Sequence, residues 1–72
     1  MTRNVENLIV AAALMERIAL SRALTYRVQA EGAFHLQDRT YYFGLAQTQE
    51  RVATTQRRII DALSYLGRLK PD

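Results

Sequence analysis

Residues 30–38 read Ala-Glu-Gly-Ala-Phe-His-Leu-Gln-Asp and divide the 72-residue sequence near its middle. Gly32 suits the position that follows the C-terminus of a helix, and Asp38 is the best candidate for the N-cap of a second helix. A connection of only about six residues between two long helices makes them antiparallel neighbours. The sequence therefore predicts a hairpin of two helices that turns at this segment.

Few helix-breaking residues stand on either side of the turn. Asn4 is a plausible N-cap near the start, and the only proline, Pro71, comes near the end. Before Gly67, Gly44 is the one residue that weakens the second half, at a cost of up to about 1 kcal/mol. Long uninterrupted helices are the expected outcome.

We therefore expect an all-α fold, an antiparallel two-helix hairpin that resembles a coiled coil, in a single domain over residues 1–72. The helices should cover about residues 3–31 and 38–69. A chain this short buries only about 60% of the surface that it exposes when unfolded, so it needs a cross-link, a metal, very regular packing or a partner. With no cysteine and one histidine, a disulfide is excluded and neither a metal nor another cofactor is expected.

Each expected helix carries an apolar stripe, and we expect the two stripes to face each other. At 100° per residue, the stripe of the first helix is rich in alanine and holds no charged residue: Val5, Leu8, Ala12, Met15, Ala19, Ala23, Tyr26 and Ala30. The second helix has an apolar repeat of seven residues, with Gln49 and Gln56 making its middle partly polar. It consists of Leu45, Val52, Ile59 and Leu66, flanked by Tyr41, Tyr42, Ile60 and Leu63.

The first helix has more apolar residues than one neighbour can cover. Two ridges at four-residue spacing remain on its other side, and a monomeric hairpin would leave them in water. We expect these residues to bind a partner: Val10, Leu14, Ile18, Leu20, Leu24 and Val28. Two occupants stay open, a second copy of the chain in a homo-oligomer and the groove of a different protein.

The residue types and their spacing give little support for a catalytic or a membrane function. His35 lies in the expected turn, the seven carboxylates are scattered, and no glycine-rich phosphate loop occurs, so we expect a protein that is not an enzyme. The most apolar stretch, residues 5–15, is too short to cross a bilayer. An export signal stays a minor alternative, because residues 2–4 and 11–13 faintly resemble the two ends of one. A cytoplasmic location without membrane contact is the expectation.

Nucleic-acid binding is the remaining alternative, because nine of the ten basic residues are arginine and the net charge is +3. The arginines are interleaved with acids rather than clustered, and Arg57 stands four residues before Asp61, as in an ordinary helix ion pair. Tyr41, Tyr42 and Phe43 could stack bases, although the first two are expected on the core side. A self-associating hairpin regulator that binds RNA therefore stays an alternative, with nucleic acid the less expected partner.

The whole pattern resembles the small co-chaperones of type III secretion needle subunits, the YscE/EscE-like family. The resemblance rests on the length, the absence of cysteine, the hairpin and the course of the second helix, from Tyr41-Tyr42-x-x-Leu45-Ala46 to Ile59-Ile60-x-Ala62-Leu63. Needle subunits are also small helical hairpins, but they characteristically have a proline in the turn. Residues 32–37 contain none, which favours the chaperone over the needle.

This resemblance implies a bacterial cytoplasmic protein that pairs with a larger helical-repeat chaperone, of the TPR-like kind. Through that chaperone it would keep a needle subunit monomeric before export. The resemblance implies neither a cofactor nor a catalytic residue.

Overall fold

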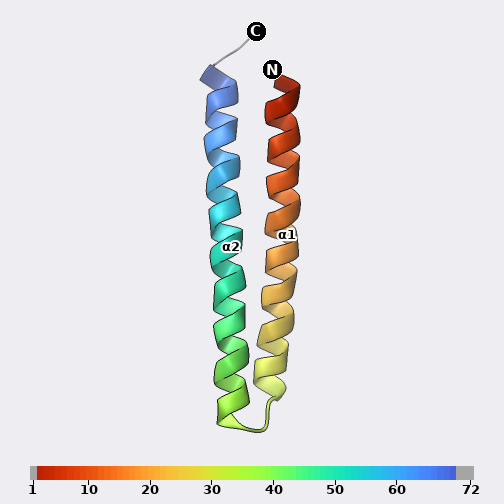
Figure 1. Cartoon of the computed structure of the whole chain (residues 1–72), viewed down its shortest axis with the longest axis vertical. Helices are drawn as coiled ribbons and strands as arrows, with labels where there is room; N and C mark the ends of the chain where they lie inside the picture. The colour runs from red at the N-terminus through yellow and green to blue at the C-terminus, as the bar shows by residue number, and fades with distance from the viewer. Residues whose placement is uncertain (1, 70–72) are drawn as a thin grey trace.

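The computed structural model describes residues 2–69, with the side chains of residues 3–68, as two long helices joined by a short turn. α1 covers Thr2–Gly32 and α2 covers Leu36–Leu69. The helices run antiparallel side by side, so the beginning of α1 and the end of α2 lie at the same end of the molecule (Figure 1). The predicted all-α hairpin is confirmed.

Both ends of α1 differ in detail from the prediction. The helix begins at Thr2, so Asn4 lies inside it rather than at its N-cap. No glycine within the described residues has a positive φ, so Gly32 is still part of the helix and not a left-handed cap. The N–H of Ala33 donates to the carbonyl of Ala30 at 3.2 Å, a three-residue step that tightens the last turn and satisfies a terminal carbonyl without a left-handed residue.

The start of α2 also differs, because the helix begins two residues before Asp38. The carbonyl of His35 accepts the first helical hydrogen bond, from the N–H of Arg39 at 3.1 Å, which places His35 at the N-cap. Asp38 lies in the first turn, where its negative charge interacts favourably with the exposed N–H groups of the helix end. The connection is therefore residues 33–35 only, shorter than predicted.

The hairpin is a thin rod, with principal extents of 57 × 14 × 11 Å and a radius of gyration of 16.4 Å. A compact domain of this length has a radius of gyration of about 11 Å. The accessible surface is 5895 Å², whereas a compact protein of the same mass exposes about 4,600 Å². Folding of the lone chain thus hides only about half of the surface of the extended chain, for which the same scaling gives about 12,000 Å².

The residues that are buried between the helices are almost all alanine. Within the described residues, Ile60 is the only large apolar side chain that is buried. The other buried apolar residues are Ala12, Ala19, Ala23, Ala30, Ala46 and Ala53. Because alanine adds only one methyl group, two alanine stripes let the helix backbones approach closely.

The predicted contact stripe of α2 is wrong by one residue. Val52, Ile59 and Leu66 are exposed and Leu45 is half-buried, while Ala53 and Ile60, each one position further along, are buried. Ile60 is a predicted flanking residue of the stripe, and its burial is confirmed. One residue is a rotation of about 100°. The physical reason is size, since Leu, Val and Ile at the contact would hold apart two helices that the alanine stripe of α1 lets approach.

Flanking positions show the same rotation. On α1 the alanines of the predicted stripe are buried, and Val5 and Tyr26 are half-buried. Leu8 and Met15 are exposed, and Ile9 and Glu16 are half-buried instead. On α2, Tyr41 is exposed and does not lie on the core side. Four residues predicted on or beside the contact stripe of α2 are half-buried next to the buried residues: Tyr42, Gln49, Gln56 and Leu63.

Candidate protein–protein interface

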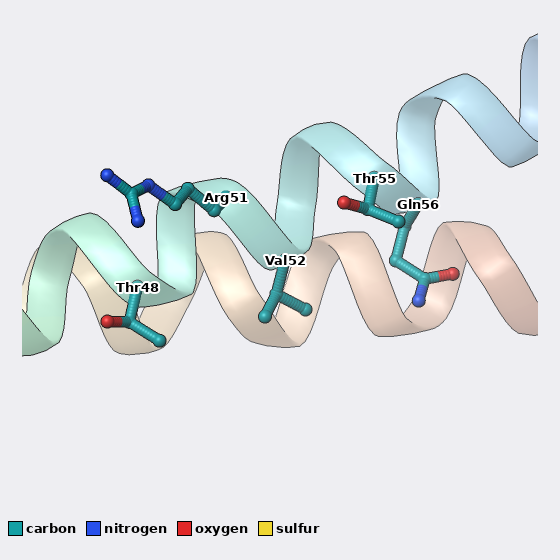
Figure 2. A pocket seen from close by; sticks show the side chains of 5 residues that line it. All are labelled: Thr48, Arg51, Val52, Thr55 and Gln56. Atoms are coloured by element: carbon teal, nitrogen blue, oxygen red, sulfur yellow. The ribbon is translucent and has the colours of Figure 1, made fainter.

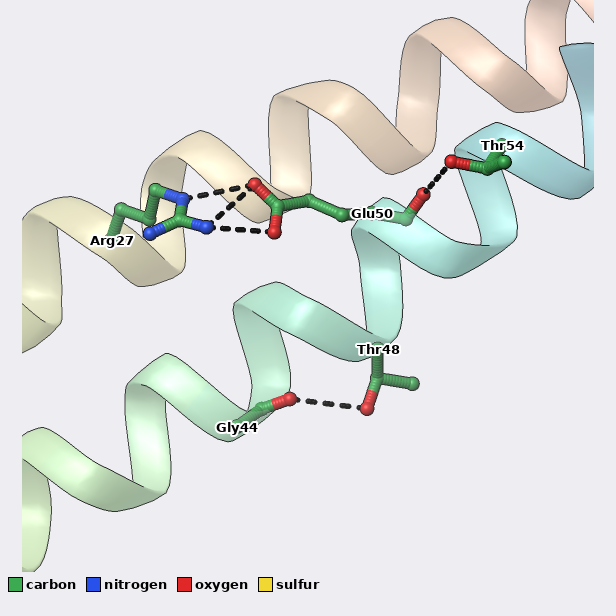
Figure 3. Close-up of polar contacts among 5 residues, drawn as sticks. All are labelled: Arg27, Gly44, Thr48, Glu50 and Thr54. Atoms are coloured by element: carbon green, nitrogen blue, oxygen red, sulfur yellow. Dashed lines mark hydrogen bonds and ion pairs between the residues drawn. The ribbon is translucent and has the colours of Figure 1, made fainter.

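Two ion pairs join the helices and mark one side of the hairpin. Arg27 and Glu50 form a bidentate pair, with Nη2 to Oε1 at 2.7 Å and Nε to Oε2 at 3.0 Å (Figure 3). Both side chains remain about two-fifths exposed, so the net contribution to stability is at most about 1 kcal/mol. The fork-to-fork geometry of a guanidinium on a carboxylate adds specificity, which here sets the register of α1 against α2.

The second ion pair lies further toward the open end of the hairpin. Arg57 donates from Nε and Nη2 to the two carboxylate oxygens of Glu16, at 3.1 and 3.2 Å. The expected Arg57–Asp61 pair is also present, but at 3.9 Å it is the longer contact. Sequence spacing revealed the pair within one helix and missed the pair between helices, because only the packed structure brings residues 16 and 57 together.

Both ion pairs lie on the same side, which we call the ionic side. Glu50 and Arg57 are seven residues apart on α2, and Glu16 and Arg27 are eleven apart on α1. Seven residues are about two turns of helix and eleven are about three turns. Glu50 and Arg57 therefore point in nearly the same direction from α2, and Glu16 and Arg27 do so from α1.

The other side of α2 is apolar. Val52 and Ile59 each follow an ion-pair residue by two positions, a rotation of about 200° around the helix axis. They belong to a row at alternating spacings of four and three residues that contains no charged residue. We call this row the α2 stripe: Tyr41, Leu45, Thr48, Val52, Thr55, Ile59, Ala62 and Leu66.

A shallow hollow of about 330 Å³ lies in the middle of the α2 stripe. Its lining is small or polar: Thr48, Arg51, Val52, Thr55 and Gln56. Figure 2 looks onto it, with Val52 near the centre and Arg51 extending away from α1. The hydroxyl of Thr48 donates to the carbonyl of Gly44 at 3.1 Å, so it needs no partner from outside its own helix (Figure 3).

The predicted partner-binding residues of α1 are all exposed, from 39% for Ile18 to 66% for Val10. Leu14 follows the buried Ala12 by two residues and Val28 precedes the buried Ala30 by two, so both point away from α2. Ile18, Leu20 and Leu24 flank buried alanines by a single residue and lie at the sides of α1.

These six residues form two patches rather than one. Val10, Leu14 and Ile18 follow one another in the first half of α1, and Leu20, Leu24 and Val28 in the second half. Arg17 and Ser21 occupy the outer positions between the patches, and the rise of 1.5 Å per residue separates Val10 from Val28 by about 27 Å. We call the two patches the α1 ridges.

Eight consecutive apolar residues make α1 apolar around its whole circumference over residues 8–15. A run of two turns points in every direction, and a single neighbouring helix covers one side only. Leu8, Met15 and Leu14 are all at least half exposed as a result. A helical segment that is apolar on every side is typical of a buried position, which the lone hairpin does not provide for residues 8–15.

Neither a metal site nor a membrane-spanning helix is present among the described residues. Within residues 2–69 no three His, Asp or Glu side chains come together in a way that could hold a metal ion. Over the same residues, neither helix combines the length and the apolarity that crossing a bilayer requires. Comparison with protein-family models, with curated proteins and with solved structures finds no match to this chain.

Proposed function

We propose that this protein is a non-catalytic co-chaperone that works by covering an apolar surface of a larger helical-repeat chaperone. Together the two proteins would keep a type III secretion needle subunit monomeric before export, in the bacterial cytoplasm. The observation that carries the proposal is the exposure of the α1 ridges, which the lone hairpin leaves in water.

The energetic argument is the incomplete core. Fully burying one Leu or Val side chain contributes about 1.5–3 kcal/mol, and the α1 ridges hold six large apolar side chains that are at least 39% exposed. The hairpin also exposes about 1,300 Å² more than a compact protein of its mass. A standard interface removes about 800 Å² from each partner, so one partner protein is enough to cover most of this excess.

The mechanism follows from the chemistry of helix association. A needle subunit that polymerises through an apolar helical stripe is held back when a chaperone occupies that stripe first. This protein would support the larger chaperone without touching the needle subunit. Packing of α1 into the larger chaperone stabilises the folded state of that chaperone by mass action. The specific identification of chaperone and needle rests on the resemblance described above.

The test replaces Leu14 and Ile18 by Asp, which puts two charges on the first α1 ridge. Because both side chains are exposed in the hairpin, helix content should change little, whereas copurification of the helical-repeat chaperone from the native cell should be lost. Mass spectrometry of the bound chains identifies the partners, and circular dichroism follows the helix content.

A matched control replaces two exposed residues on the polar side of α2, Gln47 and Thr54, by Asp, and should keep the partner. The proposal is rejected if the native protein brings down no helical-repeat protein, or if the Leu14→Asp, Ile18→Asp variant retains one. A wild-type chain that light scattering shows to be a firm dimer, dissociated by the same two substitutions, would assign the ridges to a second copy instead.

A further inference from the structure

The α2 stripe has the pattern of a coiled-coil seam, although it is not the seam that closes the hairpin. Leu45, Val52, Ile59 and Leu66 repeat every seven residues, and the companion positions between them are Thr48, Thr55 and Ala62. In a coiled coil such a row packs against a second helix along its length. Here the row lies beside the contact with α1, and Val52, Ile59 and Leu66 are 36–49% exposed.

The hollow in the stripe has the arrangement that accepts a side chain from a facing helix. A knob of one helix inserts among four residues of the other at positions i, i+3, i+4 and i+7. Thr48, Arg51, Val52 and Thr55 have this spacing, and all four line the hollow (Figure 2). Since three of the four are short side chains, the hollow suits a long apolar knob such as Leu or Ile.

The edge of the stripe is basic. Arg51 and Arg58 immediately precede Val52 and Ile59, so they occupy the flanking position that forms salt bridges between the helices of a coiled coil. Among the residues whose side chains are described, no carboxylate lies within 4.0 Å of either arginine, whereas Arg27 and Arg57 both have such partners. Both arginines are exposed. A helix that packs on the stripe therefore meets two positive charges that form no ion pair with the described carboxylates.

A second copy of the stripe does not complement these charges. In an antiparallel pair of two α2 stripes, equivalent flanking positions face each other, which places arginines beside arginines. In a parallel pair the arginines face Gln49 and Gln56, which carry no charge and are half-buried in the hairpin. Neither arrangement supplies a carboxylate, and the first one is repulsive.

We propose that the α2 stripe binds an acidic amphipathic helix of another protein. Its Leu or Ile side chains enter the hollow at Val52, and its Asp or Glu side chains pair with Arg51 and Arg58. This surface lies on α2, and Leu20 and Leu24 of the α1 ridges lie on the opposite, ionic side, so the hairpin has two helix-binding surfaces on different helices. The proposal does not depend on the identity of the α1 partner.

The test measures binding of two synthetic helical peptides of 28 residues, labelled with fluorescein, by fluorescence anisotropy. Both have Leu and Ile at the heptad core positions, and the flanking positions are Glu in one and Lys in the other. The Glu peptide should bind at least about tenfold more tightly than the Lys peptide, and the difference should shrink as salt is added. Arg51→Glu with Arg58→Glu should reverse the preference.

The matched control is Arg3→Glu with Arg17→Glu, which makes the same change in net charge on α1 and should leave the preference for the Glu peptide unchanged. Val52→Asp should weaken binding of the Glu peptide at least about tenfold while circular dichroism shows an intact hairpin. Equal affinity for the two peptides, binding of neither, or a preference that the Arg51→Glu, Arg58→Glu variant retains would each overturn the proposal.

Two further measurements separate this surface from the α1 ridges. Leu20→Asp with Leu24→Asp changes two ridge residues on the ionic side of α1 and should leave binding of the Glu peptide unchanged. Arg51→Glu with Arg58→Glu should leave copurification of the α1 partner unchanged. Failure of one proposal is thus seen independently of the other. If light scattering finds a dimer that Val52→Asp dissociates, the stripe belongs to a second copy and the acidic-helix proposal is wrong.

Discussion

Gly44 is a glycine inside a long helix, with a helical backbone and open space around it. A Cβ atom built on Gly44 meets no heavy atom within 4 Å outside its own neighbourhood in the helix. Glycine in such a place costs conformational entropy, because the unfolded chain loses more freedom there than it would with alanine. No close approach between the helices requires the missing side chain.

Gly44→Ala should therefore stabilise the hairpin by about 0.5–1 kcal/mol. For a domain of this size the midpoint of thermal unfolding should rise by about 3–6 °C, as followed by circular dichroism at 222 nm. Gly67→Ala, near the end of α2 where helices fray, is the matched comparison and should have a smaller effect. An unchanged or lower midpoint for Gly44→Ala would show that this position is not the open helical site described.

At the scale of the helix, one row of residues decides how closely α1 and α2 approach. The alanines of both helices lie at the contact, and Ile60 is the one large side chain buried there within the described residues. The neighbouring row of α2, which holds Val52 and Ile59, has larger and more apolar side chains, yet it lies outside the contact between the helices. Close packing of the alanine rows brings Arg27 close to Glu50 and Arg57 close to Glu16, so that both ion pairs form. The row of Val52 and Ile59 stays exposed.

Ala53→Leu tests this arrangement directly. A leucine at the buried Ala53 would push the backbones apart, so we expect a loss of about 1–3 kcal/mol in the free energy of unfolding. Val52→Leu places the same side chain one residue away on the exposed α2 stripe, where the loss should stay within about 0.5 kcal/mol. Urea unfolding of the two variants, measured at one protein concentration, distinguishes them. A larger loss for Val52→Leu would mean that the stripe first expected from the sequence forms the contact after all.

At the scale of the whole molecule, the hairpin is a single layer two helices wide. In a rod with extents of 57 × 14 × 11 Å each helix has only one neighbour, so little beyond the alanine rows and Ile60 is buried. More residues of the same kind would lengthen the rod without creating an interior. Partners on the α1 ridges and on the α2 stripe would add the missing layers.

The isolated chain should accordingly be only marginally stable. A single small core rarely supplies more than about 3–5 kcal/mol, and the core here consists of alanines and one isoleucine. We expect urea unfolding, extrapolated to water, to give a free energy of unfolding below about 5 kcal/mol. This value should not depend on the protein concentration. A partner present at 100 times its dissociation constant should add about 2.7 kcal/mol. A lone chain that is much more stable, or whose stability rises with its own concentration, would indicate a self-sufficient homo-oligomer.

The sequence by itself determined the two helices and their antiparallel order. Runs of strong helix formers without an internal proline specify long helices, and a short connection leaves them no arrangement except side by side. It also determined that α1 has more apolar surface than one helix can cover, because eight consecutive apolar residues occupy every direction around the axis.

Only the tertiary structure decided which rows meet. α2 has two adjacent rows with a seven-residue repeat, the larger one through Val52 and the smaller one through Ala53, and apolar periodicity alone favours the larger. The choice depends on how closely two backbones pack, which is a property of both helices together and not of either sequence pattern. The ion pairs Glu16–Arg57 and Arg27–Glu50 follow from that choice, since residues 41 and 23 positions apart become neighbours only in the packed pair.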